Sequence, residues 1–411
     1  ASNNTAVGLS ALTANTTGTE NVAVGAYALD ACTTGSYNHA IGRSAGGAIT
    51  TGDTNIAIGN TTLGVVTTQS VKTSVGHNSL GQNASDNNTA VGKEAMKLNT
   101  TGAANVAVGK VAMEENTTGS SNTAVGYEAL NDNTTGDYNT ALGAYALDAN
   151  TTADNNTAIG DNALGANTTG HSNTAIGMRA LDACTDGNKH ICIGYDAGGA
   201  IQGIEENDCF GAYAGAAITT GGYNTCLGAY TGNYTVSITT GQKNNIIGNY
   251  SHTSAVDSVN QTVFGYNVAG SGDNTLTFGT GGSDTTCSYG GTTWSAPSDI
   301  RLKEDIQDEV VGLDFINELR PVTFLWKKAK DVPSEMKVYD PESEERVMDG
   351  KYNHGFVAQE VKEVIDKHGL KEGFDMWTED EIDGRQRVGE SALIPMLVKS
   401  IQELSAEVEQ L

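Results

Sequence analysis

The sequence predicts a mainly β repeat solenoid followed by a small α+β domain that ends in a coiled-coil helix. Three observations support this fold class. A glycine closes an Ala-[Val/Ile/Leu]-Gly triplet, or a variant of it, every 17 residues between Gly8 and Gly265, with one step of 16 and one of 20. All five prolines lie at or after Pro297. The last apolar residues follow heptad spacing, which is typical of coiled coils.

The same observations divide the chain. A fixed short period indicates stacked coils, so residues 1–266 are expected to form a β-solenoid of 17-residue coils. The repeat decays over residues 267–297, which are expected to form closing strands at Asn274–Phe278 and Thr292–Trp294 and a linker. Residues 298–411 are rich in charge and have no repeat, so they are expected to form a separate domain.

The best-formed unit reads Asn-Thr-Ala-Val-Gly and begins at Asn122. Adjacent strand residues point to opposite faces. The residue before the glycine is branched or large, as at Val24, and the residue before that is small, as at Ala23. We expect the bulky side chains to be buried, with one cover supplied by the interior of the coil. We expect the face that demands alanine to lie against a neighbouring subunit.

Each unit continues with a second short segment, such as Ala129-Leu130, and an Asn-Thr-Thr-Gly turn. This pattern predicts two strands and two turns per coil, because Asn and Gly favour turns. The recurrent Asn four residues before the glycine indicates either a stacked amide ladder or an Asx turn. Cys192, Cys209 and Cys226 replace alanine in the repeat, so they are expected to be small buried hydrophobes rather than metal ligands.

The Asn-x-Ala-[Val/Ile]-Gly core resembles the head repeats of YadA-like trimeric adhesins and the repeats of viral and phage tail-fibre proteins. The resemblance implies a homotrimer, built either as a trimeric β-roll or as a triple β-helix. Exposed tyrosines such as Tyr127 and Tyr145 are either ordinary turn residues or stacking faces for a sugar.

The remaining elements are expected in chain order after the repeat. We expect a short strand running into Ile306, a helix over residues 311–319 and a strand over residues 322–327 with Trp326 in the core. A charged loop or hairpin follows, and then a strand and a helix over residues 354–365. The C-terminal helix is expected over residues 389–411, with Ile394, Ile401 and Val408 at one heptad position and Leu397, Leu404 and Leu411 at the other.

The tail carries Ser298-Asp-Ile-Arg-Leu-Lys303, Pro-Val-x-Phe-x-Trp, His-Gly-Phe-Val-Ala-Gln-Glu and the terminal apolar helix. With these motifs it resembles the self-cleaving intramolecular chaperone domain of endosialidases and phage tail fibres. The resemblance implies that Ser298 and Lys303 form a catalytic dyad and that the chain is cut between Pro297 and Ser298. Asp299 is expected to help position the catalytic group or to polarise the site, and His354 is expected to be a structural turn residue.

The spacing of the dyad limits its geometry. Five residues on an ideal helix turn by about 500°, which leaves the two side chains about 140° apart. Either Ser298 therefore precedes regular structure, or Lys303 acts on a serine of another chain.

The predicted function is a trimeric viral tail-fibre shaft that contacts a host-cell surface receptor, either a glycan or a surface protein, and so belongs to the virion. The single-turnover serine endopeptidase is the one enzyme activity expected, with no cofactor and no metal. The net charge of −26 argues against nucleic-acid binding, and no apolar run predicts membrane insertion. The alternative is a bacterial trimeric surface adhesin whose tail is not cleaved.

Overall fold

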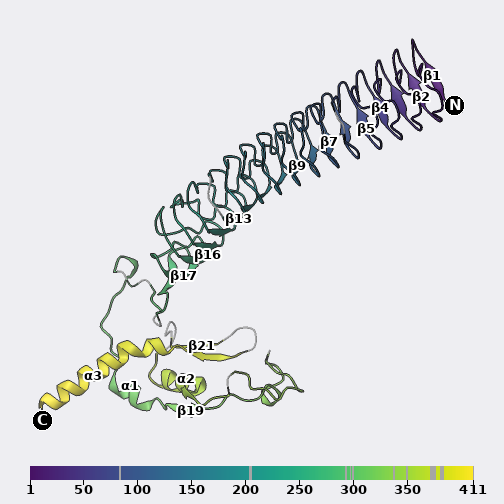
Figure 1. Cartoon of the computed structure of the whole chain (residues 1–411). Helices are drawn as coiled ribbons and strands as arrows, with labels where there is room; N and C mark the ends of the chain where they lie inside the picture. The colour runs from purple at the N-terminus through teal and green to yellow at the C-terminus, as the bar shows by residue number, and fades with distance from the viewer. Residues whose placement is uncertain are drawn as a thin grey trace. The chain divides into compact units, whose positions relative to one another are not determined.

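The computed structural model describes residues 1–82, 85–202, 206–291, 294–296, 298, 300–336, 338–348, 350–370, 376–379 and 384–410. The chain divides into two compact units, Ala1–Pro297 and Ser298–Leu411. The first is a β-solenoid of stacked coils, and the second is a small domain with short strands and a terminal helix (Figure 1). The predicted fold class is therefore confirmed.

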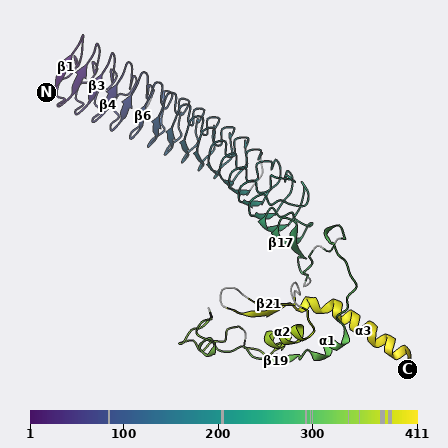
Figure 2. The same ribbon diagram turned by 180° about the vertical axis from the view of Figure 1, so that it is seen from behind.

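Each coil of the solenoid contributes one short strand, and successive strands pair in parallel (Figure 2). In most coils the register is 17 residues, so that Ala23 pairs with Ala40. The strands are β1 (Thr5–Val7), β2 (Val22–Val24), β3 (His39–Ile41), β4 (Ile56–Ile58), β5 (Thr73–Val75), β6 (Thr89–Val91), β7 (Val106–Val108), β8 (Thr123–Val125), β9 (Thr140–Leu142), β10 (Thr157–Ile159), β11 (Thr174–Ile176), β12 (Ile191–Ile193), β13 (Asp208–Phe210), β14 (Thr225–Leu227), β15 (Asn245–Ile247) and β16 (Thr262–Tyr266).

The glycine after each strand is required by both conformation and space. Gly25 has a φ of +132°, which side-chain-bearing residues rarely adopt. A Cβ atom added there would lie 2.5 Å from the carbonyl oxygen of Gly42 in the next coil. The repeat period is therefore set by a column of glycines whose backbones meet directly.

The alanine of each strand points into the coil, and the bulky residue points outward. Ala23 is fully buried, whereas Ile41, which follows the buried Ala40, is 44% exposed. The expectation that the bulky side chains fill the interior and the alanines face a neighbour was wrong. In most coils the interior behind the strand already holds side chains from the second segment, so a small residue takes this position. In the last coils Ile246 and Val263 take it and are also fully buried.

The second segment of each coil is a turn rather than a strand, which corrects the expectation of two strands per coil. Leu29 has a left-handed φ of +49° and its side chain is fully buried. Its N–H donates to the carbonyl oxygen of Ala45 in the next coil at 3.1 Å. The left-handed leucine costs conformational energy, but it carries the largest apolar side chain of the coil into the core.

Some coils replace this leucine by glycine and fill the core from elsewhere. A Cβ atom added to Gly198 would lie 2.8 Å from the Cδ1 atom of Ile201. In leucine coils the residue equivalent to Ile201 is smaller or polar, such as Asn133 beside Leu130. Four coils use the glycine-isoleucine combination, with the pairs Gly46 and Ile49, Gly198 and Ile201, Gly215 and Ile218, and Gly232 and Ile238. The core volume is thus kept by exchanging two residues together.

The recurrent asparagines form a buried amide ladder. The side-chain oxygen of Asn38 accepts the backbone N–H of Asn55 at 3.0 Å. Its Nδ2 donates to the carbonyl oxygen of Gly52 at 2.8 Å. The ladder therefore satisfies backbone groups that no strand pairs, as buried polar groups require. Fully buried members are Asn21, Asn38, Asn88, Asn105, Asn122, Asn139, Asn156, Asn173, Asn207 and Asn244.

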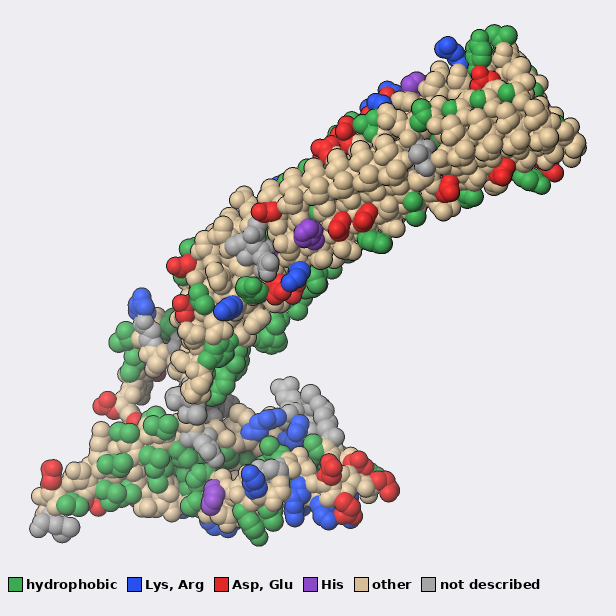
Figure 3. Space-filling model, viewed as in Figure 1, with side chains coloured by type: hydrophobic (Ala, Val, Ile, Leu, Met, Phe, Trp, Pro, Cys, Tyr) green, Lys and Arg blue, Asp and Glu red, His purple; other side chains and the backbone are tan. Residues whose placement is uncertain are grey.

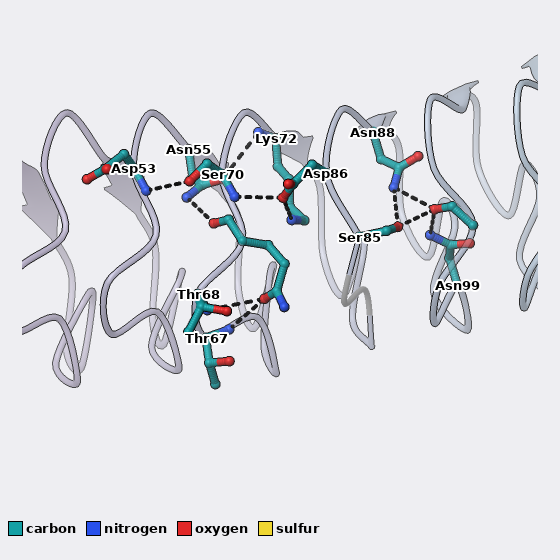
Figure 4. A network of polar contacts seen from close by, with 12 residues as sticks. Asp53, Asn55, Thr67, Thr68, Ser70, Lys72, Ser85, Asp86, Asn88 and Asn99 are labelled. Atoms are coloured by element: carbon teal, nitrogen blue, oxygen red, sulfur yellow. Dashed lines mark hydrogen bonds and ion pairs between the residues drawn. The ribbon is translucent and has the colours of Figure 1, made fainter.

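One coil replaces the ladder asparagine by a lysine (Figure 4). The side chain of Lys72 is fully buried, and its Nζ lies 3.5 Å from a carboxylate oxygen of Asp86. Burial lowers the pKa of Lys72 below its usual range, and Asp86 opposes this shift. The 16-residue step also falls here, between Gly76 and Gly92. This coil therefore departs from the regular repeat in both its length and its buried polar residue.

Three cysteines stand in register on neighbouring strands. Cys192 pairs with Cys209, and Cys209 pairs with Cys226. All three are fully buried and carry free thiols. The neighbouring thiol of Cys209 and burial raise the pKa of Cys226 well above its usual value. The interpretation as buried hydrophobes is confirmed.

The solenoid closes with the antiparallel pair β17 (Thr275–Thr280) and β18 (Ser283–Ser288). β17 agrees with the closing strand expected at Asn274–Phe278, whereas β18 was not predicted. Trp294 contacts Phe278 edge-on, with 5.5 Å between ring centroids. Thr292 and Thr293 lie outside the described residues.

The C-terminal unit is built from short elements around one core. They are the 3₁₀ helix η1 (Ile300–Leu302), α1 (Leu313–Glu318), β19 (Val322–Phe324), η2 (Ala329–Asp331), β20 (Asn353–Gly355), α2 (Ala358–Lys367), β21 (Trp377–Glu379), β22 (Gln386–Val388), η3 (Glu390–Ala392) and α3 (Leu393–Gln410). Phe315, Val361, Met376 and Met396 pack together in the core. α1 and α3 are further tied by the carboxylate of Glu403, which accepts the N–H of Leu313 at 2.8 Å.

The expectations for residues 303–312 and for Trp326 were wrong. Residues 303–312 contain no strand, because the chain there is charged and packs against no neighbouring strand. Trp326 is half-buried rather than part of the core, and it contacts Phe324 edge-on at 5.3 Å. The strand that precedes it ends at Phe324, so Trp326 lies beyond the paired residues.

Candidate functional site

Ser298 and Lys303 lie in contact at the start of the C-terminal unit. The Nζ of Lys303 donates a hydrogen bond of 2.7 Å to the Oγ of Ser298. Ser298 precedes regular structure, and the single turn of η1 (Ile300–Leu302) lies between the two residues. The N–H of Lys303 donates to the carbonyl oxygen of Ile300 at 3.2 Å, which closes this turn. The turn folds the lysine back onto the serine, which an ideal α-helix would not do.

This pair has the parts of a nucleophile and a base. A serine hydroxyl becomes an effective nucleophile when a neighbouring base takes its proton. In the observed bond the lysine donates, so the base would act after the ammonium loses a proton. Both residues are exposed in the single chain. Burial favours the neutral form of a lysine, so the single chain does not supply that part of the activation.

The other expected site residues can be placed only in part. Pro297 and Asp299 lie outside the described residues. His354 lies on β20 opposite Thr323 rather than in a turn. It is exposed, and it lines a hollow of about 490 Å³ with Pro321, Phe356 and Leu393.

The terminal helix presents an exposed apolar stripe. Leu393, Met396 and Ser400 are buried on the side of α3 that faces its own domain. Ile401 is 65% exposed on another side, and Figure 3 shows hydrophobic side chains along this helix. The exposed stripe, named here the α3 stripe, consists of Ile394, Leu397, Ile401, Leu404 and Val408. Leu411 lies outside the described residues.

The solenoid also presents an apolar row on the outside of its sheet. These residues, named here the outer row, are those that directly precede the strand glycine, and they stack at the spacing of the strands, about 4.8 Å. Parallel sheets are normally covered on both faces, whereas this apolar row is exposed. Clearly exposed members are Val7, Ile41, Ile58, Leu142, Leu227 and Phe264.

A column of tyrosines was missed by the sequence reasoning. Tyr213, Tyr230 and Tyr250 follow the strand glycine by two residues and stack on the solenoid surface. The signal was available, since these tyrosines recur in one phase of the repeat over consecutive coils. Tyr127 and Tyr145, which were noticed, form an isolated pair with ring centroids 5.3 Å apart.

Within the described part of the chain, no group of three or more His, Cys, Asp or Glu side chains is placed to hold a metal ion. Among the described helices, none combines the length and apolar character needed to cross a membrane.

Residues 298–370 match the model of a peptidase family described as chaperone of endosialidase. This family is the self-cleaving chaperone domain of a serine-peptidase type. The match begins at Ser298 and includes Lys303. Comparison with curated proteins and with solved structures gives no match. Together, the match and the solenoid indicate a fibre-like protein with a C-terminal chaperone domain.

Proposed function

We propose that this chain is the shaft of a homotrimeric viral tail fibre, whose C-terminal domain drives trimerisation and folding and is then released by self-cleavage. The observation that carries the proposal is the hydrogen bond between Lys303 and Ser298, at the first residues of the matched chaperone domain. The shaft would belong to the virion and contact a host-cell surface receptor, either a glycan or a surface protein. Its repeats resemble those of tail fibres and trimeric adhesin heads.

The cleavage chemistry balances with these residues. Neutral Lys303 takes the hydroxyl proton of Ser298, and the Oγ attacks the carbonyl carbon of Pro297. The C–N bond breaks, the amine of Ser298 takes up a proton, and an ester joins Pro297 to the Oγ. Water then hydrolyses the ester, which leaves the Pro297 carboxylate and restores the serine hydroxyl. Asp299 would help to position this site.

Assembly provides the reason for a removable domain. The coils are nearly alike, so three shafts could pair one coil out of register, and parallel stacking of distant segments is slow to begin. The α3 stripe has heptad spacing and would hold three chains together at their C-termini. The outer row would then be covered by the partner subunits. After release of the domain, the folded shaft would be kinetically trapped, because the element that directs folding is no longer present.

The direct test is the intact mass of the purified protein and of its variants. We expect two fragments for the wild type, the larger ending at Pro297, and one full-length mass for both Ser298→Ala and Lys303→Gln. Ser295→Ala is the matched control and should be cut like the wild type. A single full-length mass for the wild type would contradict self-cleavage and favour the uncut adhesin alternative.

Cleavage is expected to depend on assembly, because Lys303 is exposed in the single chain and needs burial to act as a base. Ile401→Asp places a charge in the α3 stripe and should give a monomer that is not cut. Gln402→Asp, on the neighbouring exposed position, should remain trimeric and be cut. Efficient cleavage of a monomeric Ile401→Asp protein would show that the dyad needs no partner chain.

A further inference from the structure

The repeat lengthens once, from 17 to 20 residues, between Gly228 and Gly248. The extra residues form a small hairpin, in which Asn233 pairs antiparallel with Ser237. The hydroxyl of Ser237 also donates to the side-chain oxygen of Asn233 at 3.2 Å. Insertions in repeat proteins map to loops that often serve binding, so the residue at the tip of this hairpin is of interest.

That residue is Tyr234, which the hairpin holds against the tyrosine column. Tyr213, Tyr230 and Tyr250 stack with centroid distances of 4.9 and 5.5 Å. Tyr234 meets Tyr250 at 4.9 Å and 61°. Tyr266, from the following coil, meets Tyr250 at 5.8 Å and 85°. The rings of Tyr234 and Tyr266 therefore meet the column at steep angles at the coil that carries the insertion.

An open surface hollow of about 540 Å³ lies beside these rings. It is lined by Tyr230, Tyr234, Tyr250, Tyr266 and Asn267. The volume is in the range of small-molecule sites, about 300–1,000 Å³. Tyr234 and Tyr266 are 52% and 58% exposed, so their rings are open to a ligand.

The backbone that carries the hollow is firmly held. The N–H groups of Tyr230, Tyr250 and Asn267 donate to carbonyl oxygens of the preceding coils at 2.9, 3.1 and 2.9 Å. In the described structure no hydrogen bond engages the phenol hydroxyls of the four lining tyrosines or the side-chain amide of Asn267. The site therefore combines fixed aromatic walls with polar groups that remain available to a ligand.

From this lining we infer that the hollow is a binding site for a neutral sugar unit of a glycan. A pyranose ring has one face of C–H groups, which packs on an aromatic ring, and a rim of hydroxyls, which pair with phenols and amides. None of the described residues that line the hollow is charged, so an anionic ligand would lose hydration without gaining an opposite charge. The inference names a class of ligand for the receptor contact in the proposed function. It rests on the proposed function only for its biological role.

The test is saturation-transfer NMR on the full-length protein with a panel of neutral disaccharides, namely lactose, maltose, cellobiose and mannobiose. We expect at least one of them to bind, with saturation strongest at its C–H protons. Tyr234→Ala and Tyr266→Ala should each weaken that binding about tenfold, in line with the loss of one aromatic contact. Tyr234→Phe keeps the ring and should weaken it less.

Tyr127→Ala removes a paired tyrosine elsewhere on the solenoid and is the matched control, so it should bind like the wild type. Tyr234 is exposed, and amide exchange of the hairpin coil in the variant should confirm that the coil is folded. The inference is overturned if no panel member binds, or if Tyr234→Ala binds as well as the wild type. The intact mass of the same wild-type sample separates the two proposals. A wild-type protein that binds the sugar but stays full-length would support this site and contradict self-cleavage, whereas a cleaved protein that binds no sugar would do the reverse.

Discussion

The exchange of leucine for glycine with isoleucine predicts a strong coupling between two core positions. In a leucine coil, Leu130 is fully buried with a left-handed φ of +52°. Its companion Asn133 donates to Asn116 at 2.7 Å and to the carbonyl oxygen of Gly136 at 3.1 Å. We expect Leu130→Gly with Asn133→Ile to recreate the arrangement of Gly198 and Ile201.

The magnitudes follow from what each change removes. Leu130→Gly leaves a cavity that costs about 2–5 kcal/mol, offset by about 1 kcal/mol because glycine tolerates the left-handed backbone. Asn133→Ile crowds Leu130, which costs about 1–3 kcal/mol, and leaves its hydrogen-bond partners unpaired. In the double variant the isoleucine fills the cavity. We therefore expect it to be about 2 kcal/mol more stable than the sum of the single changes.

Amide hydrogen exchange measured on peptides from coils 122–150 is the suitable assay, because it reports the local free energy of opening. A coupling of about 2 kcal/mol corresponds to about a 30-fold difference in exchange rate. The control combines Asn133→Ile with Leu164→Gly, two coils away, where the effects should add. Additivity within about 0.5 kcal/mol for the Leu130 pair would refute the reasoning.

Three further predictions concern single positions of the solenoid. Lys72→Asn should slow amide exchange in its coil at pH 7, because the lowered pKa means that burying the charged lysine costs stability below the folded-state pKa. That gain should shrink as pH rises toward 10.5, where the unfolded lysine also loses its proton. Asn122→Ala should cost about 2–4 kcal/mol, since it strands the buried N–H of Asn139 and the carbonyl of Gly136. Ser121→Ala should be nearly neutral in stability, because Ala104 takes the equivalent position of another coil at φ +57°. Equal losses of stability for Asn122→Ala and Ser121→Ala would contradict the role of the ladder. Gly25→Ala should cost at least about 2 kcal/mol, measured by the same exchange assay, whereas Gly282→Ala, with no atom within 4 Å of the added Cβ, should have no comparable effect.

Much of the solenoid could be predicted from the sequence, because glycines recur at a fixed period and such a period indicates stacked coils. What the sequence did not reveal is which strand face lies inside. Val24 is more apolar than Ala23, so hydrophobicity alone favours burying the valine. The structure buries the alanine because the interior is narrow, and it leaves the outer row to be covered from outside the chain. The more apolar residue of the strand therefore lies on the outer face and not in the core.

The sequence predicted which residues make up the candidate site, but not how they contact one another. The motif singled out Ser298 and Lys303, and helix geometry excluded one arrangement. The contact itself depends on one 3₁₀ turn, which no periodic pattern predicts over three residues. The tyrosine hollow was missed for a different reason, since it depends on a three-residue insertion that brings side chains of successive coils together.

The amide ladder also makes the shaft a molecular ruler. Within the regular coils, as at Asn139, a ladder asparagine forms hydrogen bonds with the coil before it and with the coil after it at a fixed register. Each regular coil therefore presents the same donors and acceptors to its two neighbours. Removal or duplication of one regular 17-residue unit would bring equivalent coil surfaces together again and change the length of the solenoid by about 4.8 Å. Fibre length could thus evolve in whole steps, by recombination between neighbouring units, without any new core having to be found.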